Sequence, residues 1–209
     1  MIQRIKCGIN NVYILSQGED AILVDTGTRK DRQKILRACR GKNIRLIALT
    51  HGHYDHAQNA AFLSRALGAP IAMHPADAPL IENMLAEPLE SPFWTGKVLL
   101  WFMKLAKGRF PRSEPFGIDV ALREGFSFDA YGVDARVIEL PGHTRGSVGI
   151  VAPEGLLAGD ALTNLFPPAG KAALWSDEAA MLASAAKAGA LGDMTVYFGH
   201  GEPAGNREW

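Results

Sequence analysis

Cysteine is scarce in this chain, which holds only Cys7 and Cys39 among its 209 residues. Two cysteines are too few for the disulfide framework that small secreted proteins use, and neither lies near the histidine-rich segment described below. We therefore expect both cysteines to be free, buried thiols.

An excess of charge and a long hydrophobic run are also missing. The 22 Lys and Arg residues balance 22 Asp and Glu residues, so we expect no nucleic-acid partner, since such a protein needs a basic surface for phosphate contacts. The longest apolar run, residues 98–103, is far too short to cross a bilayer, and residues 1–6 alternate like a strand rather than like a secretory signal. We expect a cytoplasmic protein without a transmembrane segment, acting on a small molecule.

The pattern of strands and helices favours one domain over residues 1–209. Strand-like runs at 2–6, 12–16 and 21–25 are separated by spacers rich in Gly, Asn and Asp, which predicts an antiparallel meander. Helix-like segments are expected at 30–40, 57–67 and 176–191. Further strands are expected at 44–49, 71–73, 120–123, 126–128, 133–140, 148–152, 156–158 and 194–198.

The segment 50–56 has the sequence Thr-His-Gly-His-Tyr-Asp-His and joins the strand at 44–49 to the helix at 57–67. Side chains two apart in an extended chain point the same way, so His51 and His53 can share one cation. Asp55 and His56 lie past the bend and face a neighbouring position. Such a set of imidazoles and a carboxylate suits zinc, and also iron or manganese. The alternative interpretation of this segment is a polar loop with exposed histidines. Because three of the six histidines gather here, we predict a metal site.

Three further strand ends carry a side chain of a metal-binding type. His143 lies in the turn 141–147, Asp160 follows a glycine, and His200 stands between two glycines. With the segment 50–56, four strand ends thus present a ligand, which predicts that these corners meet. His74 also ends a strand, but we interpret this single histidine as structural. Asp25 either accepts a hydrogen bond from a metal-bound histidine or caps its own turn.

Residues 79–119 interrupt this pattern with Pro88, Pro92, Pro111 and Pro115 and a helix-like core at 93–110. The part from 91 to 113 holds no acidic residue, but it holds five basic and five aromatic ones: Lys97, Lys104, Lys107, Arg109 and Arg112, with Phe93, Trp94, Trp101, Phe102 and Phe110. The first interpretation is a lid whose tryptophans Trp94 and Trp101 contact an apolar substrate and whose cations attract an anionic one. The alternatives are a packed helical insertion with solvated lysines, or an interfacial helix that touches a membrane or the second subunit of a homodimer.

These motifs, in this order, resemble the metallo-β-lactamase superfamily in its hydrolase branch, and the resemblance spans about the whole chain. It implies an α/β (α+β) fold, a four-layer αβ/βα sandwich with the site at one edge of the paired sheets. It also implies two divalent metal ions, zinc first, with iron or manganese as alternatives. One ion would be held by His51, His53 and His143, the other by Asp55, His56 and His200, and Asp160 would bridge both.

Differences between this chain and individual branches of the family narrow the range of expected activities. Asp160 stands where lactam-cleaving members carry cysteine or serine, which argues against antibiotic hydrolysis. Flavodiiron oxygen reductases have Glu where His53 stands and need a flavin domain. Hydroxyacylglutathione hydrolases (glyoxalase II) are similar in ligands, but fuller members add a helical C-terminal domain. Acyl-homoserine-lactone lactonases are similar too, with a shorter run between the ligands that match His56 and His143.

We therefore expect a dinuclear hydrolase that uses a bridging hydroxide on a small ester, thioester or lactone. Asp55 is the expected catalytic residue, which orients the nucleophile and passes a proton to the leaving group. Arg145 and Asn164, close in sequence to ligands, are candidate substrate contacts beside Trp94 and Trp101. The alternatives are a phosphodiesterase, a mononuclear iron enzyme resembling persulfide dioxygenases, and a binding protein without activity.

Overall fold

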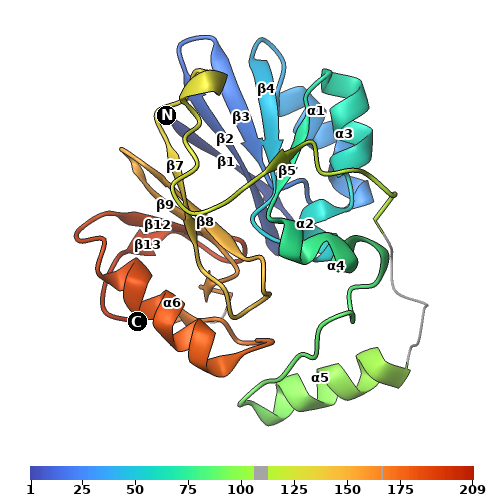
Figure 1. The fold of residues 1–209 in the computed structure, drawn as a ribbon, viewed down its shortest axis with the longest axis vertical. Coiled ribbons are helices and arrows are strands. Elements are labelled where there is room, and N and C mark those ends of the chain that lie inside the picture. The colour runs from blue at the N-terminus through green and yellow to red at the C-terminus, as the bar shows by residue number, and fades with distance from the viewer. Residues whose placement is uncertain (106–112, 166) are drawn as a thin grey trace.

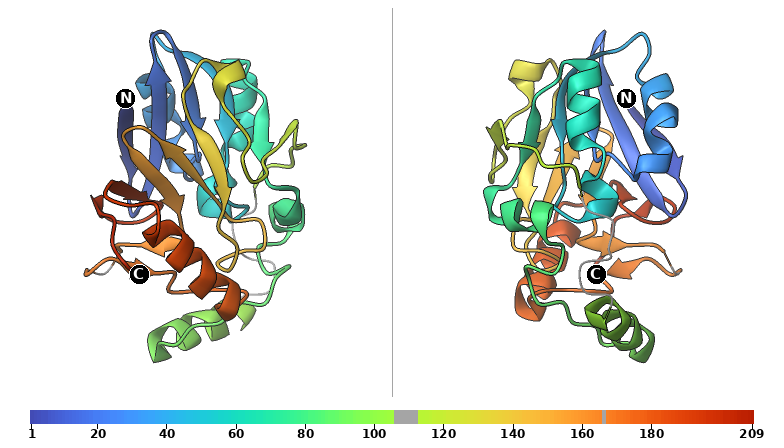
Figure 2. Two further views of the ribbon diagram at one scale, coloured as in Figure 1. Left: turned by 60° about the vertical axis from the view of Figure 1, so that its left-hand side comes forward. Right: turned by 90° about the vertical axis from the view of Figure 1, so that its right-hand side faces the viewer.

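The computed structural model of the chain describes residues 1–105, 113–165 and 167–209, and it contains two β-sheets packed face to face (Figure 1). In the described part, six strands form the first sheet in the order β1-β2-β3-β4-β5-β6, and five form the second in the order β13-β12-β9-β8-β7. Helices α1 and α3 cover the outer face of the first sheet, and α6 covers that of the second (Figure 2). The four-layer αβ/βα sandwich expected from the sequence is thus confirmed.

The first half of the chain forms the first sheet and its helices. Its strands are β1 (Ile2–Cys7), β2 (Asn10–Gln17), β3 (Asp20–Val24), β4 (Asn43–Ala48), β5 (Ile71–Met73) and β6 (Val120–Ala121). Its helices are η1 (Arg29–Asp31), α1 (Arg32–Ala38), α2 (Tyr54–Ala57), α3 (Ala60–Leu67), η2 (Pro75–Asp77), α4 (Ala78–Glu82) and α5 (Trp94–Leu105). Strands β1 to β3 pair antiparallel, which confirms the predicted meander, and β3 to β6 run parallel.

The second half forms the other sheet, a separate two-stranded sheet of β10 and β11, and one long helix. Its elements are η3 (Asp129–Tyr131), β7 (Arg136–Glu139), β8 (Val148–Ala152), β9 (Gly155–Gly159), β10 (Leu162–Thr163), β11 (Gly170–Lys171), α6 (Glu178–Gly189), β12 (Thr195–Phe198) and β13 (Ala204–Gly205). Strands β9 and β12 are parallel neighbours, so their carboxyl ends lie at the same edge of the sheet. Helix α6 begins after Asp177, whose carboxylate accepts a hydrogen bond from the Ala180 N–H.

Alternating side chains along the strands divide the interior into three apolar layers. In β4, Leu46 points between the sheets, where it joins Phe128 and Ile150, and its neighbour Ile47 points outward to α1 and α3. The third layer lies under α6, where Ala185 and Ala188 belong to one buried cluster with strand residues of the second sheet. These small side chains let α6 pack closely against the second sheet.

Several element boundaries differ from the prediction. The helix expected at 57–67 is split into α2 and α3 at Asn59, whose side chain donates hydrogen bonds to the backbone carbonyls of Thr26 and Thr28. Asp55 and His56 consequently lie on helix α2 rather than before a helix. The strand expected at 126–128 is reduced to one bridge between Ser127 and Arg136. Residues 106–110 of the helix expected at 93–110 lie outside the described residues.

Within the three described ranges, none of the helices combines the length and the apolar character that crossing a bilayer requires.

Both cysteines are free and buried, as the sequence predicts. Burial raises the pKa of the Cys7 and Cys39 thiols to about 11. At pH 8, this shift from an ordinary pKa of 9.0 lowers the reactive thiolate fraction from about one in ten to about one in a thousand. We expect both thiols of the native chain to react with Ellman's reagent about a hundredfold more slowly than those of the chain unfolded in guanidinium. Fast reaction of two thiols in the native chain would contradict this.

Candidate metal centre

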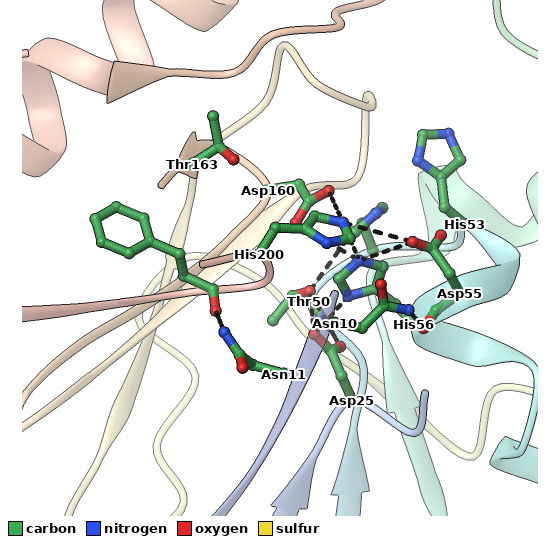
Figure 3. A network of polar contacts seen from close by, with 12 residues as sticks. Asn10, Asn11, Asp25, Thr50, His53, Asp55, His56, Asp160, Thr163 and His200 are labelled. Atoms are coloured by element: carbon green, nitrogen blue, oxygen red, sulfur yellow. Dashed lines mark hydrogen bonds and ion pairs between the residues drawn. The ribbon is translucent and has the colours of Figure 1, made fainter. Parts of the chain in front are cut away.

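The four ligand-bearing corners meet at one edge of the paired sheets. Figure 3 shows three of them, which carry His53, Asp55 and His56, then Asp160, and then His200. His51 and His53 follow β4, Asp55 and His56 lie on α2, and the remaining three follow β7, β9 and β12. Their donor atoms form three overlapping groups in which all atoms lie within 4.8 Å of one another: His51, His53 and His143; His51, His56 and Asp160; Asp55, His56 and His200. All seven predicted ligands are therefore brought together.

The first group consists of three buried imidazoles. The Nδ1 atom of His53 faces the Nε2 atom of His143 at 3.0 Å, and the ring centroids of His51 and His143 are 4.8 Å apart. Burial, together with the neighbouring imidazoles, lowers the pKa of His51 and that of His53, the latter to about 3. Neutral imidazoles are the form that binds a metal. Among the described residues the Nε2 atom of His51 is buried without a hydrogen-bond partner, as a metal ligand would be.

The group of Asp55, His56 and His200 combines a carboxylate with imidazoles, and the Asp160 carboxylate lies beside it. The Nε2 atom of His200 is 3.1 Å from Asp160 Oδ2, 3.5 Å from Asp55 Oδ2 and 3.4 Å from His56 Nε2. Burial alone would lower the pKa of His200, but the Asp160 and Asp55 carboxylates outweigh it and raise this pKa to about 10. Burial alone would raise the pKa of Asp55, but His56 and His200 hold it at about 2. Such a cluster attracts positive charge, which a divalent cation supplies.

Asp160 lies between the group of His51, His53 and His143 and the group of Asp55, His56 and His200. Its Oδ2 atom is 3.8 Å from His143 Nε2 on one side, and its Oδ1 atom is 3.5 Å from His56 Nε2 on the other. A side chain at Gly199 would collide with both Asp160 and the His56 ring, so glycine is required for this close approach. The donor set and the buried atoms without partners thus fit a pair of cations with Asp160 between them.

Asp25 anchors His56 from behind. Its Oδ2 atom accepts a hydrogen bond from His56 Nδ1 at 2.9 Å, and its carboxylate also accepts hydrogen bonds from the N–H and the hydroxyl of Thr50 (Figure 3). Asp25 is also the non-glycine residue with a positive φ among the described residues, at 60°. The first of the two sequence interpretations, that Asp25 orients a ligand histidine, is the one that this geometry supports.

Three further ligand histidines are held through Nδ1, whereas His53 turns its Nδ1 towards His143. His51 Nδ1 is 3.1 Å from the Thr50 hydroxyl, His143 Nδ1 donates to the Leu174 carbonyl at 2.7 Å, and His200 Nδ1 donates to the Ile9 carbonyl at 3.1 Å. With Nδ1 engaged, each ring turns Nε2 towards the centre.

Two asparagines that sequence reasoning placed in a turn are part of this scaffold. Asn10 and Asn11 begin β2 and are buried, so the turn between β1 and β2 is shorter than expected. The Asn10 amide donates to the Asp55 carbonyl at 2.9 Å, and the Asn11 amide donates to the carbonyls of Phe198 and Gly201 on either side of His200. The N-terminal hairpin therefore fixes two ligand loops. The adjacent Asn pair at the start of a strand is the sequence feature that could have indicated this role.

Asp77 joins two other ligand loops, and sequence analysis gave it no role. Its Oδ2 atom accepts hydrogen bonds from the Gly52 N–H and the Thr144 hydroxyl, both at 2.8 Å, and Oδ1 accepts one from the Gly146 N–H at 2.6 Å. Gly52 lies between His51 and His53, whereas Thr144 follows His143. Burial raises the pKa of Asp77 to about 6 although these hydrogen bonds lower it.

The candidate substrate contacts lie outside the cluster. The Arg145 side chain is 73% exposed, and the Asn164 amide donates to the Glu202 carbonyl. Trp94 and Trp101 are exposed on α5, so their contact with a substrate stays a prediction. His74 lies apart from the ligands, 3.2 Å from Glu139 and 2.8 Å from Arg123, as its structural interpretation implies.

Comparisons with known proteins show what the chain is similar to. The sequence profile of the family described as the metallo-beta-lactamase superfamily matches residues 5–200. A solved structure, TTHA1623 in a di-iron-bound form, is similar with a TM-score of 0.68 at 27% identity, over 98% of this chain and 94% of that one.

Two sequence relatives are similar over part of their length. An uncharacterized protein of Mycobacterium tuberculosis is 36% identical over 144 residues, 66% of this chain and 58% of the relative. A hydroxyacylglutathione hydrolase of Anaeromyxobacter dehalogenans is 33% identical over 153 residues, 73% of this chain and 46% of the relative. The match thus covers about half the length of these curated relatives.

Replacing Asp25 by Asn tests its hold on His56. Asn tolerates the positive φ, but its NH2 group makes His56 Nδ1 the acceptor, so that the proton moves to the Nε2 atom needed for a metal. We expect metal affinity, measured by chelator competition with elemental analysis, to fall about 10- to 100-fold. Asp31→Asn is the matched control, because that buried carboxylate binds only Thr28 in the described contacts. Equal affinity in both variants would refute the anchoring role.

Asp77→Asn tests the link between the loops of His51 and His143. The Asn NH2 group must face an N–H or hydroxyl donor, which separates the loops. We expect about a tenfold loss of metal affinity in the same competition assay. Asp119→Asn, which alters a carboxylate that accepts from the Ile71 N–H away from the site, should bind metal like the wild type. Unchanged affinity in Asp77→Asn would show that the loops hold their positions without it.

Proposed function

This chain belongs to the metallo-beta-lactamase superfamily, and we propose that it is a hydrolase with two divalent cations that cleaves a small ester, thioester or lactone. The observation that carries this proposal is the presence of two complete ligand triads with Asp160 between them. A relative named hydroxyacylglutathione hydrolase makes a thioester the first substrate to test.

The residues of the candidate site have two proposed roles, binding metal and transferring a proton. His51, His53 and His143 would hold one cation, Asp55, His56 and His200 the other, and Asp160 would contact both. When bound, the two cations supply Lewis acidity that activates water and polarises the substrate's oxygen. Zinc is the first candidate metal, and the di-iron-bound relative supports iron as the alternative.

Asp55 is the proposed proton carrier. Its side chain is 22% exposed, more than the 13% of Asp160, so it is the ligand carboxylate more open to a substrate. The hydrogen bond from Asn10 to its backbone carbonyl fixes its position on α2. A carboxylate so placed accepts the proton of the attacking water at Oδ and returns it to the leaving group.

Four candidate functions give different results in one experiment. The purified chain is analysed for metal and assayed with a panel of thioesters, esters, lactones and phosphodiesters, with oxygen uptake recorded for a glutathione persulfide. The proposal expects two ions per chain and hydrolysis. One iron with oxygen uptake would instead support the enzyme resembling persulfide dioxygenases, and turnover of phosphodiesters alone would support the phosphodiesterase. A metal-free chain without turnover would support a binding protein.

His53→Ala removes a ligand of the first cation. We expect kcat/KM on the responsive substrate to fall by more than about a hundredfold, because even the loss of a group that only orients a ligand costs 10- to 100-fold. His74→Ala removes the histidine that lies outside the cluster, and we expect its kcat/KM to stay near that of the wild type. Full activity of His53→Ala would refute the proposed mechanism.

A further inference from the structure

Helix α5 lies apart from the two sheets, at one end of the molecule (Figures 1 and 2). One side of it is anchored, since Leu100 is buried with Leu89 and contacts the partly buried Leu174. Gly96 lies close to Ser91, whose hydroxyl donates to the Ala173 carbonyl at 3.0 Å. The helix therefore has a defined seat on the chain around 89–91 and 173–174.

The opposite side of α5 exposes large apolar side chains. Trp94 is 76% exposed, Val98 43%, Trp101 57% and Leu105 59%. Their spacing of four, three and four residues places them on one face of the helix, and Phe102, 57% exposed, lies beside them. A contiguous apolar patch of this kind on a protein surface marks an interaction site.

Charge distinguishes the possible partners of this face. Residues 91–105 contain two lysines and no acidic residue. Lys97 lies three residues after Trp94 and four before Trp101, so it flanks the apolar stripe. Two copies of this face would bring like charges together, whereas an anionic bilayer accepts both features. Aromatic side chains enter the boundary between headgroups and acyl chains, and lysines reach the phosphates.

We propose that α5 docks this protein on the surface of an anionic phospholipid bilayer. The helix lies in the plane of the interface, with Trp94, Val98, Trp101 and Leu105 inserted and Lys97 against lipid phosphates. Leu174 contacts the anchored side of α5, and its carbonyl accepts the hydrogen bond from His143. Docking would consequently bring the candidate metal centre close to the membrane, independently of which bond is cleaved there.

The test is sedimentation of the full chain with vesicles of phosphatidylcholine alone or mixed with phosphatidylglycerol. We expect the protein to sediment with the anionic vesicles, to be released by high salt, and to show a blue shift of tryptophan emission when bound. Absence from the anionic vesicles would overturn the proposal. Equal binding to both kinds of vesicle would overturn the contribution of Lys97.

Variants locate the binding on α5. Trp101→Glu should lower partition onto anionic vesicles by at least about tenfold, because it loses a buried aromatic and adds repulsion. Lys97→Gln should lower it about fivefold. Leu182→Glu, which changes an apolar side chain 45% exposed on α6, is the matched control and should bind like the wild type.

Three outcomes would contradict the membrane proposal and identify another role for α5. Partition of Trp101→Glu equal to that of the control would show that another surface binds lipid. A wild-type dimer in sedimentation velocity that Trp101→Glu converts to monomer would assign the face to a second copy. A raised KM of Trp101→Glu for a soluble ester, with unchanged partition, would assign it to a lid. Thermal unfolding of each variant checks that the fold is kept.

Discussion

The structure depends on a buried edge where five imidazoles and two carboxylates face one another. Ring nitrogens such as His53 Nδ1 and His143 Nε2 approach to 3.0 Å, and Asp160 Oδ1 is buried without a hydrogen bond among the described residues. Burying such groups is costly unless a charge of the opposite sign compensates them. A pair of divalent cations would supply partners for all of these donor atoms. The close, buried donors that are unfavourable without a cation are therefore suited to binding metal.

The surrounding scaffold holds the edge together from several directions. Asp25 joins β3 to α2, Asp77 joins the loops of His51 and His143, and Asn10 with Asn11 joins the N-terminal hairpin to α2 and β12. Each contact links segments that are distant in sequence. Backbone and carboxylate contacts within the chain thereby position these side chains, and such positioning reduces the cost of ordering ligands when a metal binds.

Helix α5 follows a different rule from the other elements. Helices α1, α3 and α6 bury their apolar residues against a sheet, whereas α5 buries Leu100 and leaves Trp94 and Trp101 in solvent. The carbonyl of Leu174 connects the seat of this helix to His143. The side chain of Leu174 thus packs on the anchored side of α5, while its carbonyl holds His143.

The sequence by itself determined the meander, the free thiols and the identity of the seven clustered side chains, whereas the sandwich class followed from its resemblance to a known family. It could do so because strand periodicity, turn residues and donors at strand ends are local features. Only the tertiary structure decided that Asp77 and the Asn10–Asn11 pair hold ligand loops and that α2 begins inside the histidine motif. These facts depend on distances between remote segments, which local pattern does not encode. The exposure of α5 has the same origin, since periodicity marks an apolar face but packing decides what covers it.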